Sequence, residues 1–133
     1  MAGGAARVSM RPDHVACYAR IDAMPGNDRA VQLRKGVLEL GILAVLDREE
    51  CYAIEIIERL GAYPALAPTP GTVYPLLARL DKAGLVATRW AESSGGPPRK
   101  YYRLTEEGRA SLSEGAVAWV ALSSAMTKIL AGE

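Results

Sequence analysis

The sequence predicts a mainly helical α+β protein of the winged helix-turn-helix class that ends in a long helix, and three observations predict it. A short amphipathic helix begins near Gly71 and stops at Gly84. Two β-rich segments follow it and are joined by a Gly/Pro/Ser tip at 92–98. A helical segment with a seven-residue repeat then occupies 105–130.

Length and composition limit the classes of protein that remain. A chain of 133 residues, half of them apolar, is most simply one domain. There is no CxxC motif or Cys/His cluster, and the single histidine, His14, leaves little basis for a catalytic triad. Cys51 is expected to be a small buried hydrophobic residue. The longest apolar stretch is too short to span a bilayer, and the first ten residues carry no secretory signal. We therefore expect a cytoplasmic protein that is not an enzyme, with no metal, cofactor or membrane partner.

The net charge of +1 conceals a basic segment. The region 69–109 holds seven Lys or Arg residues against four acidic residues, whereas 39–58 holds six acidic residues and one Arg. Because phosphate binding depends on the local potential, this distribution is compatible with a nucleic-acid partner. A solvated face of mixed charge is the alternative interpretation.

The segments before the central helix comprise a leader, two helices and a connector. Residues 1–28 are expected to be a weakly ordered extension, or alternatively an arm that touches DNA or a second subunit. Residues 29–46 are expected to form a helix that is apolar on nearly every side after Gly36, which is typical of a buried helix and, in a small domain, of one that meets a second subunit. Residues 51–60 form a short amphipathic helix that ends at Gly61. Three prolines make 62–70 an extended connector.

The central helix, predicted to begin at Gly71 or Thr72, has two distinct faces. At about 100° per residue, its apolar residues share one sector that must face the core, and they are Val73, Leu76, Leu77 and Leu80. The opposite side carries Thr72, Pro75, Arg79 and Lys82. Proline is tolerated only in the first turn, so free N–H groups and small polar side chains lie at this end of the helix. Such an end can dock on DNA phosphate and base edges, although an ordinary surface helix has the same pattern.

The second strand of the predicted hairpin carries both basic and aromatic side chains. Successive residues of 99–104 face opposite sides, so Arg99 and Lys100 place positive charge on both faces. Because both follow the tip, we expect them to contact phosphate, which positions a protein on DNA more than it specifies sequence. Of Tyr101 and Tyr102, we expect one to pack in the core and the other to hydrogen-bond phosphate.

The last helix carries a seam for a partner. Thr105 is a helix-capping residue followed by two acids that the helix dipole favours. Two series spaced by seven form a seam of just over two heptads: Leu112, Trp119 and Met126, and Gly115, Leu122 and Ile129. A single small domain cannot cover this stripe, so we expect a homodimer. The predicted division is an extension at 1–28, a winged helix-turn-helix at 29–104 and a dimerisation helix at 105–133.

Five motifs follow one another between Gly71 and Gly108: GT-x-YPLL-x-RL, an AGL-V turn, a Trp, GPPRKYY and LT-x-x-G. This series closely resembles the PadR family of transcriptional regulators, and the resemblance extends over roughly 33–130. The family's second helix usually carries Tyr-Gly-Tyr-Glu, of which this chain keeps only Tyr52 and Glu55. Ile54 replaces the second Tyr, which leaves no specific DNA or packing role for that position.

The resemblance implies a homodimeric winged-helix repressor that binds an operator in double-stranded DNA. The residues expected to contact DNA are Tyr52 and, in the major groove, Thr72, Tyr74, Pro75 and Arg79, with Lys82, Arg99 and Lys100 on phosphates. Dimerisation is expected through Leu112, Trp119, Leu122, Met126 and Ile129. The alternative is a winged-helix module that binds another protein and no DNA.

The two tryptophans are expected to have different roles. The resemblance places Trp119 at a position where flat apolar compounds stack at the dimer interface, which implies a small aromatic effector that releases the repressor. The alternative is that Trp119 only fills the interface. Trp90, in the first strand of the hairpin, is expected to pack the hairpin against the core.

Overall fold

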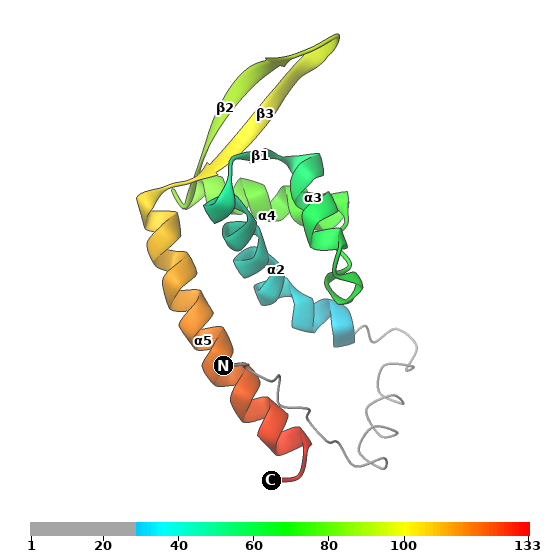
Figure 1. Ribbon diagram of the computed structural model, residues 1–133, viewed down its shortest axis with the longest axis vertical. Helices are drawn as coiled ribbons and strands as arrows, with labels where there is room; N and C mark the ends of the chain where they lie inside the picture. Colours follow the sequence, from blue (N-terminus) through cyan, green and yellow to red (C-terminus); the bar gives the residue numbers. More distant parts are fainter. Residues whose placement is uncertain (1–28) are drawn as a thin grey trace, which may run out of the picture. The chain divides into compact units, whose positions relative to one another are not determined.

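The computed structural model describes residues 29–133, and the predicted extension at 1–28 lies outside the described residues (Figure 1). The elements are α2 (Arg29–Arg48), β1 (Cys51–Tyr52), α3 (Ala53–Gly61), the one-turn 3₁₀ helix η1 (Pro64–Leu66), α4 (Pro70–Lys82), β2 (Val86–Ser93), β3 (Gly96–Leu104) and α5 (Glu106–Leu130). The strands form one antiparallel sheet in the order β1-β3-β2. This arrangement is a winged helix-turn-helix, in which α4 is the recognition helix and β2–β3 is the wing, and it confirms the predicted fold class.

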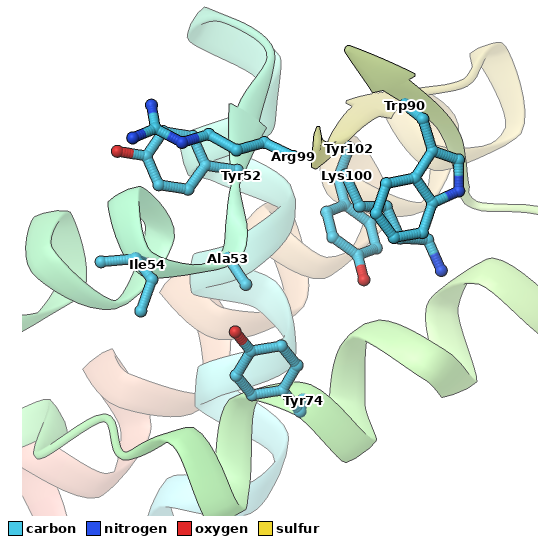
Figure 2. A pocket seen from close by; sticks show the side chains of 8 residues that line it. All are labelled: Tyr52, Ala53, Ile54, Tyr74, Trp90, Arg99, Lys100 and Tyr102. Atoms are coloured by element: carbon cyan, nitrogen blue, oxygen red, sulfur yellow. The ribbon is translucent and has the colours of Figure 1, made fainter. Parts of the chain in front are cut away.

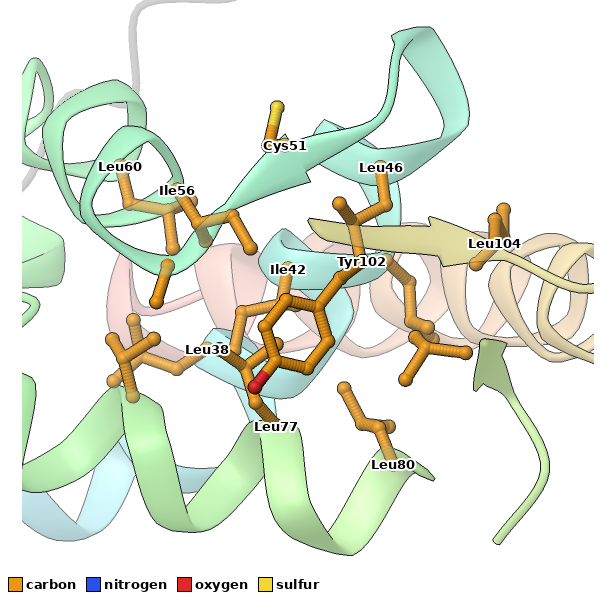
Figure 3. Close-up of a cluster of buried hydrophobic side chains, with 14 residues drawn as sticks. Leu38, Ile42, Leu46, Cys51, Ile56, Leu60, Leu77, Leu80, Tyr102 and Leu104 are labelled. Carbon is orange, nitrogen blue, oxygen red and sulfur yellow. The ribbon is translucent and has the colours of Figure 1, made fainter. Parts of the chain in front are cut away.

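A single cluster of apolar side chains holds α2, α3, α4 and the base of the sheet together (Figure 3). Its members are Leu38, Ile42, Leu43, Leu46, Cys51, Ala53, Ile56, Leu60, Val73, Leu77, Leu80, Val86, Tyr102 and Leu104. Three of the four residues predicted to form the apolar face of the recognition helix are buried, and Leu76 packs against the cluster while partly buried. The prediction from helical spacing is therefore confirmed.

The turn after α4 directs the chain into the wing. Gly84 has a φ of +76°, a conformation that glycine adopts without steric cost. Its N–H donates to the Asp81 carbonyl at 3.0 Å, and the N–H of Leu85 donates to the Leu80 carbonyl at 3.0 Å. These two bonds form a Schellman motif, which satisfies the last carbonyls of α4 and fixes the direction in which β2 leaves it.

Thr105 joins the same turn to the start of α5. Its hydroxyl donates to the Gly84 carbonyl at 2.7 Å and accepts from the N–H of Gly108 at 3.0 Å. The N–H of Thr105 also donates to the Leu85 carbonyl at 3.1 Å. Thr105 is therefore the predicted N-cap of α5, and in addition it connects α5 to the end of the recognition helix.

Three element predictions were wrong in detail. Residues 51–52 were expected to start a helix, but they form β1, because Cys51 and Tyr52 pair with Tyr102 and Tyr101 of β3. The connector at 62–70 is not wholly extended, since it contains η1. The tip expected at 92–98 is shorter, because β2 extends to Ser93 and β3 begins at Gly96. Local sequence cannot reveal the first of these features, because the partner strand lies about fifty residues away in the sequence.

The chain divides into two compact units, one of which is Arg34–Ala116 and the other of which contains Val117–Glu133. The first unit includes the beginning of α5. Leu112 packs against the core cluster while partly buried, and Gly115 lies where an added Cβ would be 2.6 Å from Cδ1 of Leu40. A side chain at Gly115 would therefore require Leu40 to move.

Two glycines within helices should respond oppositely to substitution by alanine. A Cβ at Gly108 would lie 2.7 Å from Cδ1 of Leu104 and closer still to the backbone carbonyl oxygen of Leu85, which cannot move away freely. Gly108→Ala should therefore lower the free energy of unfolding by about 1–3 kcal/mol or more. Gly36 has no atom within 4 Å of an added Cβ, so Gly36→Ala should raise it by about 0.8–1.0 kcal/mol. Urea unfolding at one protein concentration measures the free energy of unfolding of both variants. Equal changes in the two variants would contradict the close contact between Gly108 and the Leu85 carbonyl.

Candidate nucleic-acid interface

The recognition helix presents a mixed polar and aromatic surface on the side away from the core. Tyr74, Pro75, Arg79 and Lys82 are exposed, whereas Thr72 is half-buried and its hydroxyl lies 3.1 Å from that of Thr69. Thr69 is the N-cap residue, but its hydroxyl caps no backbone N–H, and Pro70 stands at the first helical position. Pro70 has no N–H and the N–H of Thr72 donates to the Thr69 carbonyl at 3.0 Å, so among the first three residues of α4 only Gly71 keeps an N–H for an anion such as phosphate.

A hollow of about 500 Å³ separates the amino ends of α3 and α4 from the wing (Figure 2). It is lined by Tyr52, Ala53, Ile54, Tyr74, Trp90, Arg99, Lys100 and Tyr102. Figure 2 shows the hydroxyl of Tyr74 pointing from α4 toward Ala53, and the guanidinium of Arg99 lying beside the ring of Tyr52. The structure therefore brings together four of the predicted DNA-binding residues, Tyr52, Tyr74, Arg99 and Lys100, although they come from three separate segments.

One face of the sheet carries two adjacent tyrosines flanked by two arginines. Tyr52, Tyr101 and Arg89 are directly paired across β1, β3 and β2, so they share this face. The rings of Tyr52 and Tyr101 meet edge to face at 5.6 Å, and the Arg89 guanidinium lies 4.9 Å from the centre of the Tyr101 ring. The Arg99 guanidinium lies 4.6 Å from the centre of the Tyr52 ring. Both distances fall within the range of cation–π interactions.

On the opposite face of the sheet, side chains are buried at the base of the wing and exposed nearer the tip. Tyr102 is 6% exposed and belongs to the core cluster, and burial raises the pKa of its hydroxyl. The next pair toward the tip is Trp90 with Lys100, whose ammonium lies 5.6 Å from the Tyr102 ring. Trp90 is 68% exposed, so the prediction that it packs the wing against the core was wrong. Strand alternation does direct it to the core side, but its side chain lines the hollow and does not belong to the core cluster.

The acidic residues between α2 and α3 pair with some arginines and leave others available. Glu50 accepts hydrogen bonds from Arg89, one of them at 2.9 Å, and Glu49 pairs with Arg59. Asp47 pairs with Arg109 at 3.3 Å. The hydrogen bond from Arg89 holds the pKa of the Glu50 carboxyl below its ordinary value. Among the described side chains, Lys82, Arg99 and Lys100 have no carboxylate within 4.0 Å, so their charges remain available to an anion.

Arg79 and Lys82 lie apart from the hollow. The Arg79 guanidinium forms an ion pair with Glu39 of α2 at 3.1 Å, while its side chain is 71% exposed. Arg79 therefore occupies the flank of α4 that faces α2, whereas Tyr74 occupies the flank that faces the wing. Helical spacing alone grouped Arg79 with Pro75 and Lys82 because it cannot reveal Glu39 as a partner.

The seam residues predicted on α5 fall into two groups. Leu112 contributes to the core of its own chain. The others are exposed large side chains, with Trp119 at 47%, Leu122 at 62%, Met126 at 47% and Ile129 at 63%. Large apolar residues exposed in such a series are typical of an interface with another protein surface.

Two kinds of site are missing from the part of the chain that the structure describes. Between residues 29 and 133, no group of three or more His, Cys, Asp or Glu side chains is placed to hold a metal ion. Within the same residues, no helix is long and apolar enough to cross a membrane. Cys51 is fully buried, which raises the pKa of its thiol and agrees with its predicted role as a core residue.

The fold and the surface beside α4 define a winged-helix protein of the DNA-binding class. The model of the PadR-like family of transcriptional regulators matches residues 42–114, and the chain belongs to that family. It is accordingly a DNA-binding transcriptional regulator, and the predicted resemblance is confirmed.

Two solved structures and one further sequence relative support this assignment. A PadR-like transcriptional regulator from Bacillus cereus is 37% identical with a TM-score of 0.68, and the match covers 77% of this chain and 99% of that one. A PadR family transcriptional regulator from Eggerthella lenta is 33% identical with a TM-score of 0.70, covering 86% and 96%. The transcriptional regulator YqjI of Escherichia coli is 36% identical over 84 residues, which span 59% of this chain and 37% of YqjI.

Proposed function

We propose that the protein is a homodimeric repressor in which each subunit places α4 in the major groove of one operator half-site and its wing on the adjoining backbone. The observation that carries the proposal is the hollow between α4 and the wing, because Tyr74 of the recognition helix lines it together with Arg99 and Lys100. Among the described side chains, neither of these two cations has a carboxylate within 4.0 Å. Thr72, Tyr74 and Pro75 face the groove, and Lys82, Arg99 and Lys100 hold phosphates. Tyr52, at the end of β1, lies beside Arg99 in this hollow.

The proposed dimer forms through α5. Trp119, Leu122, Met126 and Ile129 recur at the spacing of a helical seam and are exposed in the single chain. A second copy that covers them would remove apolar surface from water on both subunits. Two recognition helices must then meet successive major grooves about 34 Å apart, so a change in the packing of α5 would alter DNA affinity. A small aromatic effector that stacks on Trp119 would act in this way.

The phosphate contacts of the wing can be tested through the salt dependence of binding. Arg99→Ala with Lys100→Ala should weaken binding to all duplex sequences about equally and lower the slope of log K against log salt by roughly 2, one unit for each contact. Fluorescence anisotropy with a labelled duplex measures the slope.

A matched control, Arg109→Ala with Lys128→Ala, removes the same charge from α5 and should leave the slope almost unchanged. If wild-type protein bound no duplex at any salt concentration, the proposed function would be replaced by that of a protein-interaction module. A loss confined to one base pair, with an unchanged slope, would make Arg99 and Lys100 base readers.

Arg79 and Glu39 allow a second test with effects of opposite sign. If Arg79 leaves Glu39 to contact the operator, the ion pair competes with DNA. Arg79→Ala should then weaken operator binding by about tenfold or more, equivalent to a base contact of about 1–3 kcal/mol. Glu39→Gln should strengthen it by about two- to fivefold, because an exposed pair contributes about 0.2–1 kcal/mol. Binding-site selection from random duplexes supplies the operator sequence for both measurements. If both variants bound the operator more weakly than wild type, the intact ion pair would be what operator binding needs.

Trp119 decides between a sensor and a constitutive binder. Trp90→Phe leaves Trp119 as the only tryptophan, so fluorescence then reports on α5 alone. Planar phenolic or cationic compounds should quench this signal and lower DNA affinity, since stacking adds about 0.5–1.5 kcal/mol per ring pair. Trp119→Ala should also loosen the dimer, by up to about 3–5 kcal/mol if the indole is buried there. A looser dimer together with no response to a broad aromatic panel would remove the sensor from the proposal and keep the DNA-binding dimer.

A further inference from the structure

The environment of Arg99 differs from that of the other arginine on the same sheet face. Arg89 is held by the Glu50 carboxylate on one side and lies against the Tyr101 ring on the other. Arg99 lies against the Tyr52 ring and, among the described side chains, has no carboxylate within 4.0 Å. An exposed arginine on a hairpin strand has many rotamers available. The Tyr52 ring is therefore the contact that orders the Arg99 guanidinium.

The Tyr52 ring is itself held from two sides. Its backbone pairs with Tyr101 in the β1–β3 ladder, and its N–H donates to the Glu55 side chain at 3.1 Å. The edge-to-face contact with Tyr101 at 5.6 Å fixes the orientation of the Tyr52 ring. Tyr101 in turn contacts the Arg89 guanidinium, which is hydrogen-bonded to Glu50. The row Glu50–Arg89–Tyr101–Tyr52–Arg99 thus begins at a carboxylate and ends at a guanidinium whose charge has no acidic partner in the described part of the chain.

We propose that Tyr52 is a positioning residue, whose ring holds the Arg99 guanidinium in place for a phosphodiester group of the DNA backbone. This inference rests on the proposed function and departs from the expectation that Tyr52 itself contacts DNA. A guanidinium that is already ordered loses less conformational entropy when it binds phosphate, so the ring increases affinity without touching the ligand. Both contacts of Tyr52 in the row use the ring and neither uses the hydroxyl. Phenylalanine should therefore replace it.

A double-mutant cycle separates positioning from direct contact. The variants are Tyr52→Phe, Tyr52→Leu, Arg99→Ala and Tyr52→Leu with Arg99→Ala, and each binds a fluorescein-labelled duplex of random sequence at several salt concentrations. Tyr63→Leu is the matched control, because it makes the same side-chain change at a tyrosine that is 67% exposed and does not line the hollow. A random duplex suffices because a phosphate contact carries no sequence information.

A positioning role for Tyr52 predicts a specific order of DNA affinities among the variants. Tyr52→Phe and Tyr63→Leu should bind like wild type, and Tyr52→Leu should bind about two- to fivefold more weakly, the range expected for an exposed cation–π contact. Its salt slope should fall by up to about 1, as the Arg99 contact is lost for part of the time. In the Arg99→Ala background, Tyr52→Leu should have no further effect, because the two residues act through one contact.

Three results would overturn the inference. Binding by Tyr52→Phe as weak as that by Tyr52→Leu would assign Tyr52 a direct contact with DNA. Weakening by Tyr52→Leu that persists in the Arg99→Ala background would do the same. Wild-type affinity in Tyr52→Leu removes any role for the ring. Failure of wild-type protein to bind the duplex is a separate outcome, because it overturns the proposed function itself.

A measurement on the free protein tests the stack without DNA. A ring beneath the guanidinium should shift the Arg99 Hδ resonances upfield in the NMR spectrum. Tyr52→Phe should preserve the shift and Tyr52→Leu should abolish it, with the resonances of Arg109 as an internal reference. If Tyr52→Leu does not fold, wild type and Tyr52→Phe still decide the matter, since unshifted Hδ resonances in both would contradict the contact.

Discussion

The turn at Gly84 and Leu85 is the constraint on which the candidate interface depends. Within two residues, the chain completes the recognition helix with a Schellman motif, supplies carbonyls to the hydroxyl and N–H of Thr105, and enters β2. The carbonyl of Leu85 then lies so close to Gly108 that a side chain there would not fit. The end of α4, the start of the wing and the first turn of α5 are therefore fixed relative to one another by a few backbone contacts, all within one compact unit.

The second determinant is the distribution of acidic groups around the wing. Asp47, Glu49 and Glu50 pair with Arg109, Arg59 and Arg89, and Glu39 pairs with Arg79. Three of the seven basic residues of 69–109 are therefore paired within the described part of the chain. The positive charge that remains near the hollow belongs to Arg99 and Lys100, which lie close to the tip. Uncompensated positive charge thus lies on the part of the wing that lines the hollow together with α4. Because the local potential governs phosphate binding, this part of the surface is the one expected to meet DNA.

The long last helix links the core to a surface that the single chain leaves open. Its first turns carry Gly108, Leu112 and Gly115, which contact the rest of the compact unit. Its later turns carry exposed apolar side chains such as Trp119 and Ile129. One continuous helix therefore connects the part of the molecule that positions α4 with the part proposed to meet a second subunit, and no further element is required for the two to influence each other.

The sequence by itself determined the fold class, the family, the order of elements and the core face of α4. These features depend on signals local to the chain: helical spacing of Val73, Leu77 and Leu80, a glycine where φ is positive, and a capping threonine before two acids. It also identified Tyr52, Tyr74, Arg99 and Lys100 as candidate contacts. Tertiary structure alone decided that these four line one hollow, that Arg79 pairs with Glu39, that Cys51 and Tyr52 form a strand, and that Trp90 extends beyond the core into solvent. These four features have one physical reason in common. Each depends on whether a residue distant in the sequence packs against the side chain or backbone in question, and the periodicity of a local segment carries no information on distant residues.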